Sequence, residues 1–500
     1  MELAITLDHK SSSPLHRQLY DELRRAILTR RLKLGERVPS TRAFAASLKL
    51  SRATVTQSYE QLISEGYLQA AIGSGTKVCA QLPDDLLRTT PIQAMPLKEE
   101  MKAGGQKTRT PTVKLSHYGA SLDNLLPLEA PEPESLINFK SGRPALEEFP
   151  MSEWRRLLLR HCRTGKADLL DYATDLHGVP ELRKAIADYL ARARAVRCTP
   201  EQIVIVNGSQ QAIDLITKVL IDRGDSVAVE NPGYLGARRA FLAQGAKLLP
   251  VPVDEDGIVS EALETKAAGN APQVKLIYVT PSHQFPTGGV LPLARRLELI
   301  RWAESTGAVI VEDDYDSEFR YGSRPIPALQ GLADGGNVIY VGTFSKVLFP
   351  ALRIGYIVVP HGLTRVFARA RWLADRQTPT LEQLALTDFI VEGHLERHLR
   401  RMRTLYDGRR QALVRALNHH FAERVEILGE NAGMHLMVRL RTKLNDEQIV
   451  QHAAQAGVGL VSARIYYLGQ APADEFVLGY AGLSERRIQE GVRRLAKVLR

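Results

Sequence analysis

Short apolar runs alternate with helical stretches between residues 203 and 358, and this alternation restricts the fold more than any other feature. Strands that are apolar on both faces and separated by helices are typical of a mostly parallel sheet covered on both sides. We therefore expect an α/β fold whose ligands bind beyond the carboxyl ends of the strands. The runs are Ile203–Val206, Ser226–Val229, Leu276–Val279, Val309–Val311, Val338–Val341 and Ile354–Val358.

A lysine with flanking hydroxyls follows one of these runs directly. Lys346 lies in the segment GTFSKVLFPALRIG, just after the expected strand Val338–Val341. A lysine shielded from water there can lose its proton and form a Schiff base with an aldehyde cofactor. Thr343, Ser345 and Arg353 could hold the cofactor's phosphate through charge-assisted hydrogen bonds. The rival interpretation is a solvated surface lysine, and the apolar strand argues against it.

A second strand end offers an anion site. Gly208, Ser209 and Gln210 follow the run Ile203–Val206 and start a helix. Backbone N–H groups at a helix start attract phosphate. Many turns of this kind bind nothing, so the signal gains weight only beside Lys346.

Acidic residues cluster after the run Val309–Val311, in the segment EDDYD. They are typical either of a magnesium site, of solubilising charge, or of one buried carboxylate paired with a protonated ring nitrogen. In the last case Asp313 is the better candidate for the nitrogen, and Tyr315 can donate to the ring's phenolic oxygen. Tyr234 could stack on the same ring, with simple core packing as the alternative.

The first 79 residues form a basic helical module. They hold 12 Lys and Arg against 7 Asp and Glu, which gives half of the chain's net charge of +10. Leucines and an isoleucine recur every fourth residue from Leu15 to Ile27, and Ser40 and Ser51 can cap a second and a third helix. Two short segments, 67–72 and 76–79, flank Gly-Ser-Gly as a hairpin. These elements predict a winged helix-turn-helix, although three-helix units also serve as interaction modules.

The module resembles the GntR-type winged helix. The resemblance rests on PSTRAFA from residue 39, LSRATV from residue 50 and EGYL from residue 65. It implies binding to double-stranded operator DNA, with the wing near the minor groove. The residues expected to contact DNA are Arg42, Ser51, Arg52, Thr54, Thr56 and Gln57 on the helices, and Ser74 and Gly75 in the wing.

Residues 80–133 are polar and punctuated by proline and glycine, as expected for a linker. The linker separates the winged helix at residues 1–79 from an α/β domain at 134–500. Within that domain we expect a large part to about residue 390 and a smaller part from about 391, with strands near 434–440 and 475–480.

The domain resembles the class-I aminotransferases, the fold-type-I group that uses pyridoxal 5′-phosphate. The carrying motifs are YATDLHG at 172, NGSQQA at 207, ENPGY at 230, PTG at 286, EDDY at 312 and the Lys346 segment. The resemblance implies that Lys346 forms the internal aldimine and that Asp313 pairs with the pyridine nitrogen. It also assigns the phosphate to Ser209, Gln210, Thr343, Ser345 and Arg353, and to Tyr172 from the neighbouring subunit of a dimer.

Two positions depart from that pattern. Phe285 stands where asparagine usually binds the phenolic oxygen, so Tyr315 must carry more of that bond. Val477 stands where an arginine usually clamps the substrate carboxylate, and Arg464 is our substitute for it. These departures argue against ordinary transamination of amino acids.

The joint pattern is similar to the MocR group of bacterial transcription regulators. It implies a cytoplasmic, head-to-tail homodimer that senses the cofactor, or an amine or amino acid through it. Three cysteines without metal or disulfide spacing, and the lack of a signal peptide or membrane span, fit this interpretation. We expect no metal. An active aminotransferase, and a DNA-binding protein with an inert large domain, are the alternatives.

Overall fold

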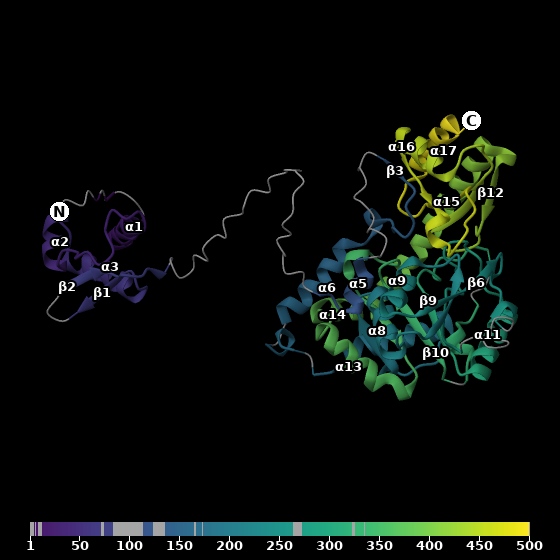
Figure 1. Ribbon diagram of the computed structural model, residues 1–500, viewed down its shortest axis with the longest axis horizontal. Coiled ribbons are helices and arrows are strands. Elements are labelled where there is room, and N and C mark those ends of the chain that lie inside the picture. The colour runs from purple at the N-terminus through teal and green to yellow at the C-terminus, as the bar shows by residue number, and fades with distance from the viewer. Residues whose placement is uncertain are drawn as a thin grey trace, which may run out of the picture. The chain divides into compact units, whose positions relative to one another are not determined.

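The computed structural model describes residues 5, 7–8, 13–71, 75–83, 114–123, 136–164, 167–172, 174–263, 273–322, 326–334 and 336–499. The chain divides into two compact units, residues 1–112 and 113–500, coloured purple and blue to yellow in Figure 1. Ser74 of the expected wing and most of the expected linker lie outside the described residues. Within the described ranges, no helix combines the length and apolar character needed to cross a membrane.

The first unit is a winged helix. Three helices, α1 (Leu15–Leu28), α2 (Thr41–Leu48) and α3 (Arg52–Ser64), pack with the antiparallel hairpin of β1 (Leu68–Ala71) and β2 (Gly75–Val78). The helices start where the sequence places capping serines. Ser40 Oγ accepts from the N–H of Ala43 at 3.2 Å, and Ser51 Oγ accepts from that of Thr54 at 3.0 Å. The core contains the apolar stripe of α1, with Leu19, Leu23 and Ile27 buried.

The second unit is built on an eight-stranded, mainly parallel sheet in the order β4-β11-β10-β9-β8-β5-β6-β7. Strand β11 runs antiparallel to both of its neighbours, and β7 runs antiparallel to β6. The strands are β4 (Ile203–Val206), β5 (Ser226–Asn231), β6 (Lys247–Asp254), β7 (Gly257–Ile258), β8 (Val274–Val279), β9 (Val309–Asp314), β10 (Val338–Thr343) and β11 (Gly355–Val358).

The last two strands of this sheet, β6 and the edge strand β7, did not emerge from the apolar pattern. Strand β6 reads KLLPVPVD, contains two prolines and is only partly buried, so it lacks the continuous apolar character of the central strands. Strand β7 has only two residues. The six apolar runs named above all correspond to strands, except that β11 begins one residue later, at Gly355.

Helices cover both faces of this sheet. On one face α8 (Ser209–Leu220), α9 (Leu235–Gln244) and α13 (Thr364–Asp375) pack on alternate residues of the strands, such as Val227, Leu276 and Val341. On the other face α7 (Pro180–Arg194), α11 (Leu293–Thr306) and α14 (Thr380–Val391) cover the intervening residues. The remaining helices of this part are α6 (Met151–Thr164) and α12 (Leu329–Leu332).

A smaller part near the C-terminus holds a four-stranded antiparallel sheet in the order β12-β13-β16-β15. Residues 137–138, which the sequence placed with the large part, pair instead with this smaller part as β3 against β14. Its elements are α15 (His394–Phe421), β12 (Val425–Leu428), β13 (His435–Leu440), α16 (Asp446–Gln455), β14 (Val458–Gly459), β15 (Val461–Ser462), β16 (Glu475–Gly479) and α17 (Glu485–Val498).

The described residues of the expected linker contact the units at both ends. Leu82 is buried in the core of the first unit. A short helix, α5 (His117–Asp123), contacts α9 of the second unit, where Ser121 Oγ donates to the carbonyl of Ala243 at 3.1 Å. The described ends of this segment are therefore too short for an apolar periodicity to reveal them.

Candidate cofactor site and DNA-binding surface

A cavity of about 330 Å³ opens beyond the carboxyl ends of the central strands. Its wall combines side chains from β9, from the turn after β10 and from the starts of α8 and α9, together with His435 of β13. Six of the residues singled out in the sequence line it: Ser209, Gln210, Tyr234, Asp313, Tyr315 and Lys346.

Lys346 is held inward by a backbone carbonyl. Its Nζ donates to the oxygen of Gly142 at 3.0 Å, and burial lowers the pKa of its ammonium group. Gly142 has a φ of +76°, and a Cβ at this position would lie 2.6 Å from Nζ. Only glycine therefore fits both the backbone conformation and the space beside the amine. A lysine whose proton is loosened in this way is suited to nucleophilic chemistry.

Asp313 presents one unsatisfied carboxylate oxygen near the cavity. Its Oδ2 accepts a hydrogen bond from Tyr278 of β8, while its buried Oδ1 has no partner among the described residues. Burial raises the pKa of this carboxyl to about 7. A buried acceptor without a partner is costly unless a donor arrives. A protonated ring nitrogen is a donor of the required kind, so the site fits the pyridine ring of pyridoxal phosphate.

The neighbouring acids turn to the other face of the sheet, because side chains alternate along β9. Glu312 accepts from the N–H groups of Leu329 and Gln330 at 3.0 Å each. Asp314 pairs with Arg194 at 2.7 Å. These two acids are therefore neutralised within the fold and do not join Asp313, which weighs against the magnesium alternative for the cluster.

The expected phosphate end is assembled from two turns. The guanidinium of Arg353 lies against Gly208, where a Cβ would come within 2.9 Å of its Nη2. Ser345 Oγ is buried and has no partner among the described residues. Thr343 Oγ1 accepts from the N–H of Ser345 at 3.2 Å. A cation thus lies at the start of α8, and an unsatisfied hydroxyl follows β10; both are groups of the kind that bind phosphate.

Phe285 is enclosed by aromatic rings. Its ring centroid lies 5.9 Å from that of Tyr234, 6.3 Å from Tyr315, 5.3 Å from His435 and 4.9 Å from Tyr466. An apolar ring in this position cannot replace the hydrogen bond that asparagine would make. The hydroxyl of Tyr315, which lines the same cavity, stays the donor that we expect from this wall.

Arg464 and Tyr172 do not line the cavity of this chain, and neither do Gly208, Thr343, Ser345 and Arg353 of the expected phosphate end. Arg464 binds Asp446 through two contacts of 2.8 and 2.9 Å, and only its neighbours Ile465 and Tyr466 line the cavity. An effector-carboxylate role would require Arg464 to leave Asp446, so that role stays a prediction. Tyr172 is 72% exposed, with Arg376 lying 5.7 Å from its ring. Val477 is buried beside Met437 and Tyr466, where it offers no charge to a ligand.

Sequence reasoning missed several residues of the cavity. Tyr278, Asp316, Arg239 and Lys140 line it, and so does His435. Tyr278 carried a usable signal, since it is the one hydroxyl-bearing residue in an otherwise apolar run that neighbours β9. Asp316 and Lys140 follow strands, Arg239 lies in α9 and His435 lies on the distant strand β13, and only the fold brings them to the cavity.

The winged helix exposes most of the residues expected to meet DNA. Arg42 and Arg52 stand in the first turns of α2 and α3, and both are exposed, as is Gln57. Ser51 also has a structural role, because its hydroxyl caps α3 and lies 2.8 Å from Thr54 Oγ1. The cations lie at helix starts, as expected for contacts with phosphates and base edges.

The described edge of the wing adds a cation that the sequence did not single out. Gly75 has a φ of +78°, and the guanidinium of Arg37 lies where a side chain at this position would point. Arg37 and Lys77 face each other across an isolated bridge. The remaining helical candidate, Thr56, is half-buried.

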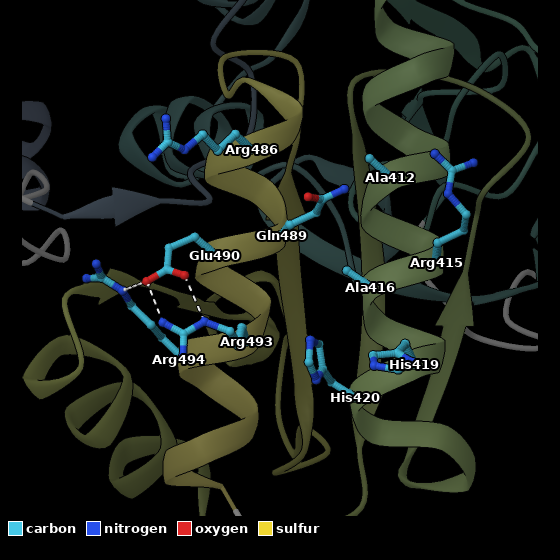
Figure 2. Close-up of a pocket in the computed structure, with 10 residues that line it drawn as sticks. All are labelled: Ala412, Arg415, Ala416, His419, His420, Arg486, Gln489, Glu490, Arg493 and Arg494. Carbon is cyan, nitrogen blue, oxygen red and sulfur yellow. Dashed lines mark hydrogen bonds and ion pairs between the residues drawn. The ribbon is translucent and has the colours of Figure 1, made fainter.

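A second hollow, of about 750 Å³, lies between α15 and α17 (Figure 2). Arginines and histidines rim it above two alanines of α15. Its one carboxylate, Glu490, pairs with Arg493 and Arg494 at 2.8 and 2.7 Å. The hollow shares no lining residue with the cavity around Lys346.

Family models match both the first unit and the second unit of the chain. The model for bacterial regulatory proteins of the gntR family matches residues 15–78, and that for aminotransferases of class I and II matches residues 134–495. The chain is 40% identical to the probable rhizopine catabolism regulatory protein MocR of Rhizobium meliloti, over 98% of this chain and 95% of that protein. It is 30% identical to the pyridoxine biosynthesis transcriptional regulator PdxR of Corynebacterium glutamicum, over 97% and 96%.

Solved structures resemble the second unit. The α-aminoadipate aminotransferase LysN of Thermus thermophilus, complexed with a phosphopyridoxyl-leucine, is 34% identical and has a TM-score of 0.68 over 73% of this chain and 92% of that one. A kynurenine aminotransferase of Pyrococcus horikoshii is 29% identical, with a TM-score of 0.69 over 78% and 95%.

Proposed function

Because the chain belongs to the GntR-family transcription regulators of the MocR type, with an aminotransferase class I and II domain, we propose that it binds pyridoxal 5′-phosphate at Lys346 and adjusts its DNA binding to the state of that site. The domain has the fold that typically binds this cofactor, and the gntR domain implies DNA as the partner. Action in the cytoplasm is part of this proposal, and the implied DNA partner supports it.

The unsatisfied Oδ1 of Asp313 is the observation that carries the cofactor proposal. It is a buried acceptor on the wall that Lys346 shares. The neighbouring Ser345 Oγ, also buried and without a partner among the described residues, could donate to the phosphate. When bound, the cofactor would supply an aldehyde for amines and a ring that withdraws electrons. Lys346 would hold the aldehyde carbon, Asp313 would keep the proton on the ring nitrogen, and Tyr234 would cover the ring.

An effector amine or amino acid is the proposed signal, with the cofactor itself as the other candidate. The name of PdxR, a regulator of pyridoxine biosynthesis, supports the cofactor for that relative. The buried Val477 stands where an arginine usually binds the substrate carboxylate, and its side chain carries no charge. Poor positioning of a substrate removes much of an enzyme's rate advantage, so the geometry favours sensing over turnover.

Assembly as a head-to-tail homodimer is part of the proposal. Tyr172 is highly exposed and lies outside this chain's own cavity, as expected if it serves the site of a second copy. Mixing the Tyr172→Phe and Lys346→Ala variants tests this. In a mixed dimer, one of the two shared sites would combine an unchanged Lys346 with an unchanged Tyr172. Partial recovery of cofactor affinity on mixing is the expected result, and strict averaging of the two variants would contradict the shared site.

The test of the regulatory proposal needs a DNA probe, which the purified chain itself can select from random-sequence duplex DNA. We expect pyridoxal phosphate to shift the affinity for that duplex in the wild type and to have no effect on Lys346→Ala. Borohydride reduction should attach the cofactor to Lys346, as peptide mass analysis would show. Labelling of a different lysine, or an unchanged affinity in the wild type, would contradict the proposal.

The enzyme alternative is favoured by one observation, the 34% identity to LysN over most of the second unit. It predicts multiple turnovers of keto product from a common amino acid at saturating pyridoxal phosphate. We expect instead less than one keto product per site in the time that an added amino acid takes to change the absorbance of the bound cofactor. Sustained turnover would make DNA binding the accessory activity.

A further inference from the structure

His283 is a buried histidine beside the cavity, and it is not one of the residues assigned to the cofactor. Its Nδ1 lies 3.0 Å from Asp316 Oδ2 and 2.9 Å from the hydroxyl of Tyr315. The same hydroxyl donates to the backbone oxygen of His283 at 3.0 Å. Asp316 and Tyr315 both line the cavity with Lys346. The imidazole thus connects a carboxylate to the hydroxyl expected at the cofactor's phenolic oxygen.

The position of the imidazole ring is fixed by its packing. A Cβ on Gly433 would come within 1.8 Å of His283 Cε1, so a side chain at residue 433 would displace the ring. On another side the tilted ring of His435 packs against it at a centroid distance of 4.7 Å. The Nε2 atom is buried and has no partner among the described residues. Of its polar atoms, Nδ1 therefore makes the described contacts.

The partners determine which nitrogen carries the proton. Ionised Asp316 only accepts hydrogen bonds, so Nδ1 must bear a hydrogen to meet it. The Nδ1–H is then shared between Asp316 and the oxygen of Tyr315. Accepting a hydrogen bond from imidazole makes the tyrosine hydroxyl a stronger donor, because bonds in a chain polarise one another. Its own proton can point either to the carbonyl of His283 or into the cavity.

We propose that His283 is a positioning residue which couples Asp316 to Tyr315, so that the Tyr315 hydroxyl donates to the phenolic oxygen of a bound pyridoxal ring. This arrangement takes the place of the asparagine that Phe285 replaces. The inference rests on the proposed cofactor site and adds to it the residue that determines the strength of this bond.

Other charges face the same three side chains and enter any pH dependence. Burial raises the pKa of Asp316, and nearby His283 and Lys346 lower it. Burial also raises the pKa of Tyr315 well above its usual value, with the nearby carboxylates adding to the shift. The titratable and charged groups around the chain of bonds are Glu230, Asp313, Asp314, Lys346 and His435.

The experiment is a double-mutant cycle read from the visible absorbance of the bound cofactor during a pH titration. The hydroxyl bond draws negative charge from the phenolic oxygen, so weakening it leaves more charge beside the nitrogen that joins Lys346 to the cofactor. That nitrogen then keeps its proton to higher pH. We expect His283→Leu to raise the titration midpoint by about half a unit to one unit, and by clearly less in a Tyr315→Phe background.

Two further variants separate positioning from packing. His283→Asn places an amide N–H near the position of Nδ1 and should restore most of the wild-type midpoint. His161→Gln is the control, because His161 forms a similar pair with Asp388 at 2.9 Å and neither residue lines the cavity. It should leave the midpoint unchanged. Should His283→Leu fail to fold, His283→Ala enters the same cycle, with circular dichroism reporting on the fold.

If His283→Leu shifted the titration midpoint equally in the wild type and in Tyr315→Phe, this inference would be overturned. The proposal that the cofactor binds would still stand. A His283→Asn midpoint equal to that of His283→Leu would also overturn it. A wild-type protein that gains no visible absorbance with pyridoxal phosphate would overturn the proposed cofactor site and this inference together.

Discussion

At the scale of single residues, the site depends on a glycine that the motifs do not mark. Gly142 combines a positive φ with the contact to Lys346 Nζ. We expect Gly142→Ala to lower the affinity for pyridoxal phosphate about tenfold or more, because the added methyl must displace the amine of Lys346. A factor of ten in affinity corresponds to about 1.4 kcal/mol. Absorbance titration with the cofactor measures this.

Gly322→Ala is the matched control for that experiment. Gly322 has a similar φ of +75°, but a Cβ there meets no atom within 4 Å. It therefore reproduces the backbone strain without the contact to the lysine. Equal cofactor affinities for the two variants would show that the close approach at Gly142 does not matter.

Asp313 should make the stability of the cofactor-free protein depend on pH. Its folded pKa of about 7 lies above the ordinary 3.8, so folding favours the protonated acid. The stability from that preference is complete below pH 3.8 and is lost as the pH rises to about 7. Asp313→Asn removes this dependence. We expect its advantage in unfolding free energy over the wild type to grow by about 2 kcal/mol between pH 5 and pH 8.

Urea unfolding of both proteins at the two pH values measures that difference. Glu230 and Glu318 also have pKa values raised to about 7 by burial, so the wild type alone would not isolate Asp313. An advantage that stays constant with pH would contradict the assignment of a raised pKa to Asp313.

At the scale of elements, α3 separates a structural serine from a candidate DNA-binding arginine. Ser51 caps the helix, while Arg52 is exposed at its first position. We expect Ser51→Ala to lower the unfolding free energy of the winged helix by about 1 kcal/mol. Thermal unfolding, followed by circular dichroism, checks this value, and an unchanged midpoint would argue against the cap.

Arg52→Ala should have the opposite profile. We expect unchanged stability and a loss of about 1–3 kcal/mol in affinity for the selected duplex at fixed salt, if the side chain reads a base. Arg25→Ala is the matched control, because Arg25 lies on α1, is largely exposed and, among the described residues, forms a local ion pair with Glu22. A loss of equal size in both variants would indicate a general charge effect instead.

At the scale of the whole second unit, the cavity joins parts that are distant in the chain. Lys346 follows the large sheet, His435 comes from the small one, and Lys140 follows the strand β3 that pairs with β14. A ligand in the cavity therefore contacts both parts, and it can shift their arrangement only through different affinities for the two states.

We accordingly expect a ligand amine to alter both the cofactor spectrum and the affinity for the selected duplex, with little keto product. A panel of amines and amino acids, each measured by absorbance, DNA binding and product assay on one preparation, tests this expectation. Lys346→Ala serves as the control that lacks the covalent site. A spectral change without any change in DNA affinity would separate the two units functionally.

The sequence by itself determined the winged helix, the mainly parallel sheet and six of the residues that line the cavity, Lys346 among them. Each of these is local: capping serines precede α2 and α3, apolar runs form the central strands, and Asp313 and Lys346 directly follow such runs. Alternation along β9 even separates Asp313 from Glu312 and Asp314. Patterns within one segment are enough for such predictions, because backbone geometry fixes which neighbours share a face.

Only the tertiary structure decided how distant segments meet. Strand β6, which lies next to the edge strand β7, has no continuous apolar pattern and is only partly buried. The contacts of His283 with Asp316 and His435, and of Gly142 with Lys346, join residues far apart in the chain. Arg464 likewise faces Asp446 because α16 packs beside it. No local periodicity encodes these meetings, because they depend on how complete elements pack against one another.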